Sequence, residues 1–406
     1  MARSVCDPQK CTSCGVCETV CPKKCIIRQQ KEDSSWYMGI DEEACVNCGL
    51  CQQICPSVTD PGLHTPQKAY AAWVLDSESH RLAASGGIAT ALYQEAVKHG
   101  FCIVGAGMQE DLTVRYSLST DSSAIAQYRN SKYTFSDLGD VPKQIVSCLK
   151  KGQSVLFIGL PCHVAAVKNY AAAAKCEENL YCVDLVCHGL PIPDFFQQHI
   201  RHLETAYGKS ASEIFFRNPD VGTGNFVLSV SEGNGSKPFY QRYVGQDDVY
   251  QIGYHNALIY KDTCYRCAYA QKERPGDLTL ADYPGLGQLS AYRHNRHKVS
   301  MVAVNTLKGE KLWDMLVNAG IIEAHERPVE EPLKYQKQMR RPSIAPKERI
   351  VFLKLYKETG GFEAAATEAF RPFVKRNAFR KAFPVVAYLQ KIPRVAKRVL
   401  LRLLQK

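Results

Sequence analysis

Two short apolar runs in the middle of the chain predict buried parallel strands. Residues 154–158 (SVLFI) and 180–186 (LYCVDLV) are rich in β-branched side chains, and an alanine-rich segment running to about Ala174 separates them. This order predicts a strand, a helix and a second strand in a right-handed parallel crossover. Cys162 and Cys187 follow the two strands. Because parallel strands end at the same edge of a sheet, we expect both thiols at the edge where open α/β sheets bind ligands.

Other patterns mark elements on either side of this unit. A helical pattern begins after Ser85, its expected N-cap, and ends near Gly100. The segments 225–231 and 237–243 flank an Asn-Gly pair and predict a β-hairpin. The segment 56–67 is rich in Pro, Thr and Ser, which predicts a linker. The linker would separate a short N-terminal part from a larger body.

The end of the chain predicts a basic amphipathic helix. At about 100° per residue, most apolar side chains of 392–404 gather on one arc. The opposite arc holds Lys397, Arg394, Arg398 and Arg402, with Leu401 among them. Three interpretations of this helix stay open. It packs its apolar face against the body, it contacts an anionic membrane surface peripherally, or it binds an acidic protein partner.

The C-terminal segment 371–406, which includes this helix, accounts for the entire net charge of +11. Residues 371–406 hold 11 of the 51 Lys and Arg residues and no acid, so the rest of the chain balances 40 basic against 40 acidic side chains. A neutral body gives no electrostatic footprint for nucleic acid, and we expect no nucleic-acid partner. The chain has no apolar secretion signal and no apolar run of the about 18 residues that a spanning helix needs. We therefore expect a cytoplasmic protein.

Ten of the 18 cysteines fall in the first 55 residues. Without an export signal, this concentration favours metal ligation over disulfides. The motif C-x2-C-x2-C-x3-C-P occurs twice, starting at Cys11 and at Cys45, and is typical of bacterial ferredoxins with two [4Fe-4S] clusters. Since the fourth cysteine of each run ligates the other cluster, we predict two crossed ligand sets. The first is Cys11, Cys14, Cys17 and Cys55, and the second is Cys45, Cys48, Cys51 and Cys21.

Zinc ribbons are the alternative for paired C-x2-C motifs, but one zinc ion needs four thiolates and has no use for a repeated Cys-Pro. Cys6 and Cys25 lie outside the motif and are not expected to be ligands. A two-cluster domain conducts single electrons and holds no substrate of its own. The function of the chain is therefore decided by its body.

The body offers four further thiols that could hold a third cluster. Cys162 and Cys187 follow the predicted strands, and Cys264 and Cys267 form a C-x2-C pair. The alternative is a buried pair of thiols together with a separate zinc or redox C-x2-C motif. No Gly-rich dinucleotide or phosphate motif follows any predicted strand, so a Rossmann NAD site is not expected.

The order of several spaced motifs resembles the coenzyme F420 hydrogenase/dehydrogenase beta-subunit family of iron–sulfur flavoproteins, over about residues 80–310. The chain departs from the usual family pattern at 160–163 (LPCH) and at 281–285 (ADYPG), where a Gly and a Trp are absent. The matching motifs are 84–87 (ASGG) with Thr90, 131–133 (SKY), 161–162 (PC), 184–189 (DLVCHG), 264–267 (CYRC), and Arg274 with Asp277.

This resemblance implies a third [4Fe-4S] cluster on Cys162, Cys187, Cys264 and Cys267, next to a non-Rossmann FAD site. Backbone amides, hydroxyls and cations suit a pyrophosphate. His163 and His188 are candidate catalytic residues that could protonate reduced flavin or substrate, with a hydrogen-bonded structural role as the alternative. The candidate FAD contacts are Ser85, Gly86, Gly87, Thr90, Ser131, Lys132, Arg274 and Asp277.

These expectations combine into one organisation. A bacterial ferredoxin-like domain (1–62) is fused to a mixed α/β flavoprotein body that contains the parallel crossover. The body is expected to divide into a beta-subunit N-terminal-like region (63–150) and a C-terminal-like region for FAD and the third cluster (151–330). A helical basic extension (331–406) follows.

The expected activity is that of an oxidoreductase that connects one-electron and two-electron chemistry. Electrons from a ferredoxin-type carrier would pass through the clusters to FAD, and from FAD to an organic partner such as F420 or another reducible substrate, or in the reverse direction. The alternative is an electron-transfer subunit without substrate chemistry, which relays electrons to a partner enzyme.

Overall fold

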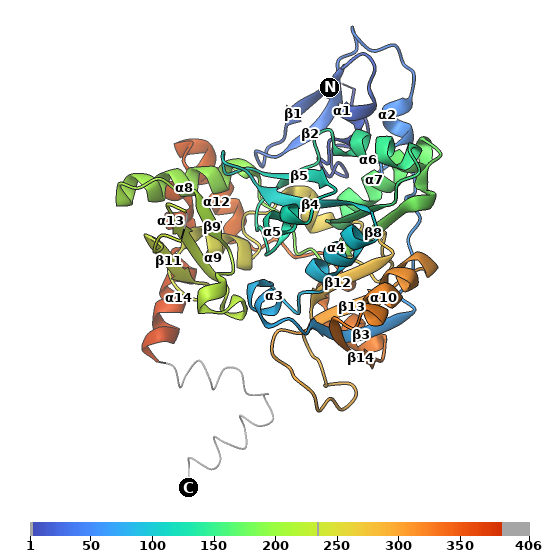
Figure 1. Cartoon of the computed structure of the whole chain (residues 1–406). Coiled ribbons are helices and arrows are strands. Elements are labelled where there is room, and N and C mark those ends of the chain that lie inside the picture. The colour runs from blue at the N-terminus through green and yellow to red at the C-terminus, as the bar shows by residue number, and fades with distance from the viewer. Residues whose placement is uncertain (1–2, 234, 384–406) are drawn as a thin grey trace.

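The computed structural model describes residues 3–233 and 235–383. Its N-terminal part forms a separate unit at one end of the molecule, with strands β1 (Ile26–Gln30) and β2 (Trp36–Ile40) paired in an antiparallel hairpin (Figure 1). Two short helices, α1 (Val16–Val20) and α2 (Leu50–Gln53), lie within the two cysteine motifs. Each begins after a glycine with positive φ, which lets the chain turn sharply between the second and third cysteine of the motif.

A nine-stranded mixed sheet forms the centre of the body. Neighbouring strands are parallel from β12 through β8 and β7 to β4, and between β5 and β6; the other pairs are antiparallel. In spatial order the strands are β14 (Ile322–Arg327), β3 (Lys68–Val74), β13 (Ser300–Val304), β12 (Leu278–Asp282), β8 (Leu180–Leu185), β7 (Val155–Gly159), β4 (Cys102–Met108), β5 (Val114–Ser119) and β6 (Ser136–Asp137).

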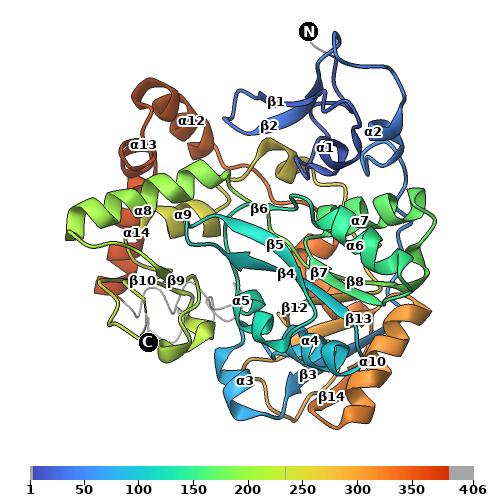
Figure 2. The ribbon, with the colours of Figure 1, turned by 45° about the horizontal axis from the view of Figure 1, so that its top comes forward.

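Helices cover both faces of this sheet, because alternate strand residues point to opposite sides. Ile103 and Leu156 pack toward α4 (Ile88–Lys98) and α10 (Leu307–Ala319). Cys102 and Val155 pack toward α6 (Val141–Lys150) and α7 (Pro161–Ala173). Helix α1 contacts α6 and α7, which places the N-terminal part against the second face (Figure 2). Short helices in the connections are α3 (Ser77–Leu82), α5 (Ile125–Tyr128) and α11 (Glu330–Tyr335).

A helical lobe lies beside the sheet and has its own aromatic core, which includes Phe195, Phe352 and Phe362 (Figure 1). Its small antiparallel sheet has the order β11 (Tyr240–Tyr243), β10 (Val227–Ser231), β9 (Glu213–Phe215). Its helices are α8 (Pro193–Tyr207), α9 (Val249–His255), α12 (Glu348–Thr359), α13 (Phe362–Ala369) and α14 (Arg371–Ala382).

The structure confirms the main features predicted for the fold. Strands β7 and β8 are parallel and α7 connects them, and β10 and β11 form the predicted hairpin. The segment 56–67 contains no helix or strand. The predicted N-cap was wrong, because Gly87, with φ +87°, occupies that position and Ser85 precedes it by two residues. The amphipathic helix predicted for 392–404 lies outside the described residues.

The helical lobe contains a buried charged contact that connects three of its helices. His199 on α8 is 1 % exposed, and its imidazole nitrogens lie 2.9 Å from Asp248 and 2.9 Å from Glu363 on α13. Asp248 caps α9 and also accepts a hydrogen bond from the Tyr240 hydroxyl. Burial alone would lower the pKa of His199, but the two carboxylates raise it to about 10. The imidazolium form therefore holds α8, α9 and α13 together.

This contact predicts a pH-dependent stability. The pKa of His199 is higher in the folded chain than its ordinary value of 6.5, so its stabilising proton is fully bound below that value and lost as the pH rises through about 10. Over that window the free energy of unfolding should fall by up to about 1.4 kcal/mol per pH unit. Thermal unfolding of His199→Gln should lack this slope, whereas His202→Gln, a change at an exposed histidine of the same helix, should keep it. Equal slopes in all three proteins would contradict the assignment.

Candidate functional site

The N-terminal part contains an inner group of cysteines that faces the body. A recess with about 260 Å³ of atom-free space brings together all members of the first predicted ligand set. Cys14 packs in the same core as Ile145 and Val167 of the body. The thiols that line this recess are Cys6, Cys11, Cys14, Cys17 and Cys55.

An outer group of cysteines forms a second recess, which encloses about 420 Å³ including open space. It contains all members of the second predicted set, and Cys48 among them is exposed. The crossed arrangement of the fourth cysteines therefore appears in both recesses. Cys6 and Cys25, to which the motif gives no role, also lie there, and the sulfur atom of Cys25 is 3.3 Å from that of Cys21. The thiols of the outer recess are Cys21, Cys25, Cys45, Cys48 and Cys51.

A third group of thiols lies in the body. Cys162 is the second residue of α7, Cys187 follows the end of β8, and Cys264 and Cys267 lie in and after a 3-10 turn over Asp262–Arg266. Burial, followed by the neighbouring Cys264 and Cys267, raises the pKa of Cys187 to about 12. Burial also raises the pKa of Cys162, and the nearby Cys267 and Cys187 contribute to that shift. Segments up to about a hundred residues apart thus bring the four predicted thiols together.

The inner and third groups are neighbours. Cys14 is among the charged neighbours that raise the pKa of Cys162. Tyr269 lies near both groups. Its pKa is raised by burial and, in addition, by the nearby thiols of Cys162, Cys14, Cys267 and Cys55. Its hydroxyl donates to the Pro56 carbonyl at 3.4 Å. The inner recess, and not the exposed outer one, is thus the side of the N-terminal part that meets the body.

The turn that carries the third group also anchors the N-terminal part. The ammonium group of Lys261 donates to the Thr12 carbonyl at 2.7 Å, and the Thr263 hydroxyl donates to the Cys11 carbonyl at 2.9 Å. The backbone amide of Asp262 donates to Asp33, and Arg349 of α12 forms ion pairs with both aspartates. The segment that precedes Cys264 therefore fixes the two groups of thiols relative to each other.

Arg274 and Asp277, both predicted to contact FAD, have partners within the protein. The guanidinium of Arg274 is 1 % exposed, forms an ion pair with Asp184, and donates to the Tyr269 carbonyl at 2.8 Å. Asp277 accepts hydrogen bonds from the Cys182 amide at 2.8 Å and the Thr306 hydroxyl at 2.7 Å. In the structure, both side chains hold strands β8 and β12 and the segment after Cys267 in place.

The Ser85–Gly87 turn packs tightly on the sheet. A Cβ atom on Gly86 would lie 2.3 Å from the Ala72 carbonyl oxygen, and the Gly86 amide donates to the Ser300 hydroxyl. The Ser85 hydroxyl donates to the Val299 carbonyl at 3.1 Å. Within the described part of the chain no side chain caps α4, so the amides of its first turn, including that of the buried Thr90, have no capping partner. Close packing explains Gly86, and the uncapped helix end is suited to an anion.

Several cations surround this turn. Lys298 donates to the carbonyls of His80 and Arg81, which precede the turn, and its pKa is lowered to about 8 by burial and by Arg217 and Arg81. Lys132 donates to the carbonyls of Gln127 and Arg129, each at 2.7 Å, and burial lowers its pKa to about 7.

The segment that holds Lys132 is tied to the same region. Asn130 donates to the Arg217 carbonyl at 2.9 Å, and its side-chain oxygen accepts from the Ser131 amide. The Thr223 carbonyl accepts a hydrogen bond from Arg217, and the Thr223 hydroxyl donates to the Ala83 carbonyl just before the turn. Among the residues that the structure describes, the buried Nε of Arg129 has no hydrogen-bond partner. Lys298, Arg81 and Arg217 thus lie near one another beside the turn, and Lys132 lies on a segment that is tied to Arg217.

The two candidate catalytic histidines occupy different surroundings. His163 is 1 % exposed, its Nδ1 lies 3.2 Å from the Tyr116 hydroxyl, and burial lowers its pKa to about 3. These contacts fit a packing role. His188 is exposed, yet desolvation by the surrounding protein lowers its pKa. The lowered pKa indicates that other segments of the protein lie close to this exposed ring. A catalytic role for either histidine stays a prediction.

The surroundings of His188 include residues that no sequence motif indicates. His255 is exposed, and desolvation followed by His188 and Arg217 lowers its pKa to about 4. Its ring lies 5.5 Å from Tyr133 and 5.4 Å from Phe226. The Arg217 guanidinium lies 4.0 Å from the Phe226 ring, and Phe226 has a φ of +50°, a strained conformation for a bulky residue. In the sequence, the glycines before Phe226 are the signal for this unusual backbone, and they form no standard motif.

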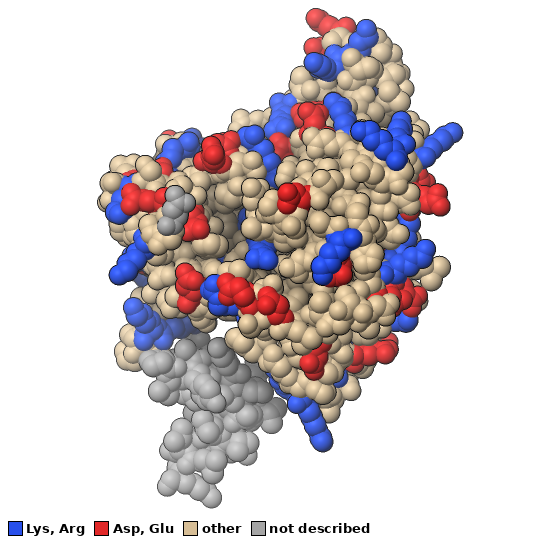
Figure 3. Space-filling model, in the orientation of Figure 1, with Lys and Arg blue, Asp and Glu red and all other residues tan. Residues whose placement is uncertain are grey.

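Charged side chains of both signs are mixed over the face shown in Figure 3. Within residues 3–233 and 235–383, no helix has the length and hydropathy that crossing a membrane requires.

Comparison with known proteins gives matches along most of the chain. The beta-subunit N-terminal model of the coenzyme F420 hydrogenase/dehydrogenase family matches residues 69–142, and its C-terminal model matches 152–330. A 4Fe-4S dicluster domain matches residues 10–58. Among curated proteins, none matches the chain.

One similar solved structure is the F420-reducing [NiFe] hydrogenase complex from Methanosarcina barkeri, in a xenon derivative. The identity is 18 %, the TM-score is 0.42, and the match covers 80 % of this chain and 96 % of that chain. The two beta-subunit models together span more than half of the chain, in the order and spacing of the motifs described above. The chain belongs to the coenzyme F420 hydrogenase/dehydrogenase beta-subunit family and carries an N-terminal 4Fe-4S dicluster domain.

Proposed function

We propose that the chain is an iron–sulfur flavoprotein oxidoreductase that passes electrons between a one-electron carrier and a two-electron organic partner. The observation that carries this proposal is the serial arrangement of three groups of thiols. The outer group includes the exposed Cys48, and the inner group contacts the third group through Cys14 and Tyr269. A carrier would therefore meet the outer group, and the third group would lead into the body.

The ligand roles of the thiols follow from their chemistry. Each of the first two groups supplies the four thiolates that a [4Fe-4S] cluster needs, and the third supplies Cys162, Cys187, Cys264 and Cys267. The raised pKa values of these buried thiols apply to the metal-free chain, and coordination to iron replaces their protons. We assign Cys6 and Cys25 no ligand role, because both ligand sets are complete without them.

The residues present also fit FAD. The uncapped end of α4 offers backbone amides to a pyrophosphate, and Lys132, Arg129, Arg217 and Lys298 supply positive charge. When bound, the clusters exchange single electrons and FAD converts them to two-electron chemistry. The chain itself would orient the cofactor and exclude water. Ser85, Gly87, Thr90, Ser131 and Lys132 remain candidate contacts, whereas Gly86, Arg274 and Asp277 would act by holding the surrounding segments.

Lys132 provides a test of the flavin site. A phosphate next to this ammonium group would stabilise its charged form, and a charge-assisted hydrogen bond contributes about 1.5–3 kcal/mol. We expect Lys132→Met to weaken FAD binding by about tenfold or more, measured by equilibrium dialysis of the reconstituted protein. Lys143→Met is the matched control, since that lysine is exposed on α6 and pairs with Asp140. Equal FAD affinity of both variants and the natural protein would remove Lys132 from the site.

The organic partner would bind beside His188. This region holds the rings of Tyr133 and Phe226, the exposed His255, and Arg217 paired with Asp282 at 3.0 Å. Aromatic walls with a few polar groups suit a planar conjugated acceptor. His188 and His255 are positioned there to hold or transfer a proton.

A relay subunit without its own substrate chemistry is the second candidate, because the family consists of beta subunits. One assay separates the two functions. Iron- and flavin-loaded protein is given a reduced ferredoxin under anaerobic conditions, and coenzyme F420 reduction is followed by its absorbance. Turnover by the chain alone supports the oxidoreductase, and turnover with other two-electron acceptors would identify a different substrate. Turnover that requires a copurifying partner would support the relay.

A further inference from the structure

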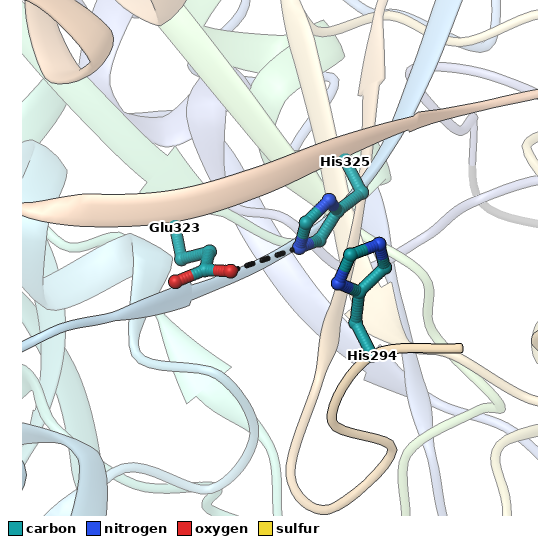
Figure 4. Close-up of side chains that lie close together, drawn as sticks. All are labelled: His294, Glu323 and His325. Atoms are coloured by element: carbon teal, nitrogen blue, oxygen red, sulfur yellow. Dashed lines mark hydrogen bonds and ion pairs between the residues drawn. The ribbon is translucent and has the colours of Figure 1, made fainter. Parts of the chain in front are cut away.

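A cluster of metal-binding side chains lies at the edge of the large sheet, away from the cysteine groups. His294, Glu323 and His325 each have a donor atom within 4.8 Å of the donors of the other two (Figure 4). Nε2 of His325 is 3.1 Å from the Glu323 carboxylate, and the rings of His294 and His325 stack with centroids 3.7 Å apart. Strand β14 is the outermost strand of the sheet, whereas the third cysteine group lies next to β8 near the middle.

Strand geometry fixes two of the three side chains. Glu323 and His325 are two residues apart on β14, so both point to the same face of the sheet. The pairing of β14 with β3 sets their register, with Glu323 opposite Trp73 and His325 opposite Ala71. The His325 ring lies 5.6 Å from the Trp73 ring, which limits its rotation. These two donors are therefore held in place before any ion binds.

The third donor lies on the connection between β12 and β13, and this connection is anchored before His294. The guanidinium of Arg327 donates to the carbonyls of Ser290 and Ala291, and Glu331 accepts from the amides of Gly287 and Leu289.

The loop is held on both sides of His294. Tyr292, which precedes His294, is 4 % exposed and packs with Ala71 and with the buried Val299, which follows His294. The exposed His294 thus lies on a short stretch between two anchored positions, over the face of β14 that carries the other two donors.

We propose that His294, Glu323 and His325 form a binding site for a divalent transition-metal ion of the zinc class. Two imidazoles and one carboxylate are borderline ligands that suit zinc better than magnesium or calcium, which prefer all-oxygen sites. Two donors each about 2.1 Å from a tetrahedral zinc lie about 3.4 Å apart. The most widely separated donor atoms therefore need to approach each other by about 1 Å or somewhat more when the ion binds. For both imidazole lone pairs to converge, the exposed His294 ring must turn out of its stacked position. Water would complete the coordination.

Such an ion would fasten the loop to the outermost strand. The exposed edge of a sheet can pair with other chains, and natural proteins often cover it. The metal would stabilise the folded chain by mass action and would keep the loop closed over β14. This role is independent of electron transfer and does not depend on the proposed function.

The test is zinc binding to the iron-loaded protein, measured by equilibrium dialysis against zinc chloride with metal analysis. We expect the natural protein to bind one zinc ion per chain without losing iron, and His325→Ala to bind none. Glu323→Gln, a mild change, should weaken binding by about tenfold or more. His297→Ala, at an exposed histidine of the same loop, should bind zinc normally.

The iron content of each variant shows that it is folded and that zinc has not replaced iron at the cysteines. The thermal unfolding temperature of the natural protein should rise with zinc, and that of His325→Ala should not. Equal zinc binding by the natural protein and His325→Ala, or no zinc binding by the natural protein at unchanged iron, would overturn the proposal.

Discussion

Replacement of Cys162 and Cys187 by alanine should lower the iron content from about twelve to about eight atoms per chain. The two thiols come from the ends of neighbouring parallel strands and lie beside Cys264 and Cys267. Two remaining thiolates cannot hold a [4Fe-4S] cluster, whereas the ligands of the other two clusters are untouched. Reduction of bound flavin by a ferredoxin should then be slower by several orders of magnitude, because the third group lies between the inner thiols and the body.

The matched control for this variant is Cys176→Ala. Cys176 is half-buried beyond the end of α7 and its sulfur contacts only the Ala171 carbonyl among the described hydrogen bonds. We expect this variant to keep its iron and its rate of flavin reduction. Iron and acid-labile sulfide analysis after anaerobic reconstitution measures the first effect, and stopped-flow absorbance measures the second. Unchanged iron in the double variant would mean that the third group holds no cluster.

Replacement of Arg274 by methionine should destabilise the body by about 3–5 kcal/mol. Arg274 is 1 % exposed and Asp184 is fully buried, and the variant would leave the carboxylate of Asp184 without its cation. Asp184 would keep only the Gly276 amide and the Thr279 hydroxyl as partners. The segment that carries Cys267 would also lose its anchor at the Tyr269 carbonyl.

Urea unfolding of the flavin-free, iron-loaded protein measures this effect. The control is Arg81→Met, since Arg81 pairs with Glu78 and Asp220 at the solvent-screened surface and should change the stability much less. Arg274→Met should also retain less iron than Arg81→Met, because its effect reaches the third group. Similar stabilities for the two variants would show that the buried pair is not a structural support.

Local sequence patterns predicted the parts of this molecule that depend on short-range chemistry. The repeated cysteine motif predicts two crossed groups of thiols, because its spacing is dictated by the size of a cluster. The structure gathers these groups in two recesses, and their role as ligands stays a prediction. The apolar runs around residue 160 predict the β7–α7–β8 crossover, since a buried parallel strand needs a continuous apolar sequence.

Long-range contacts account for what the sequence did not reveal. Arg274 suits a phosphate by its chemistry, but its partner is Asp184, 90 residues away, and no local pattern indicates that pairing. Ser85 is a good capping residue, yet the tight contact of Gly86 with β3 places Gly87 at the start of α4. The order of the inner and outer cysteine groups depends on which face of the N-terminal part meets Lys261 and Thr263.

The group of side chains around His188 was not predicted, for a related reason. Tyr133 belongs to the motif 131–133 (SKY), but Arg217, Phe226 and His255 lie in no motif. Only the folded chain brings the rings of Tyr133 and Phe226 close to His255. The metal-binding cluster at β14 arises in the same way, from one loop histidine and two strand residues.

The proposed function requires that three clusters and a flavin coexist in one chain. The decisive measurement is anaerobic reconstitution with iron, sulfide and FAD, followed by removal of unbound cofactors and analysis of iron, sulfide and flavin in the same sample. We expect about twelve iron atoms, an equal amount of sulfide and one FAD per chain. A product with about eight iron atoms and no flavin would contradict the proposed function and would leave only a two-cluster electron relay.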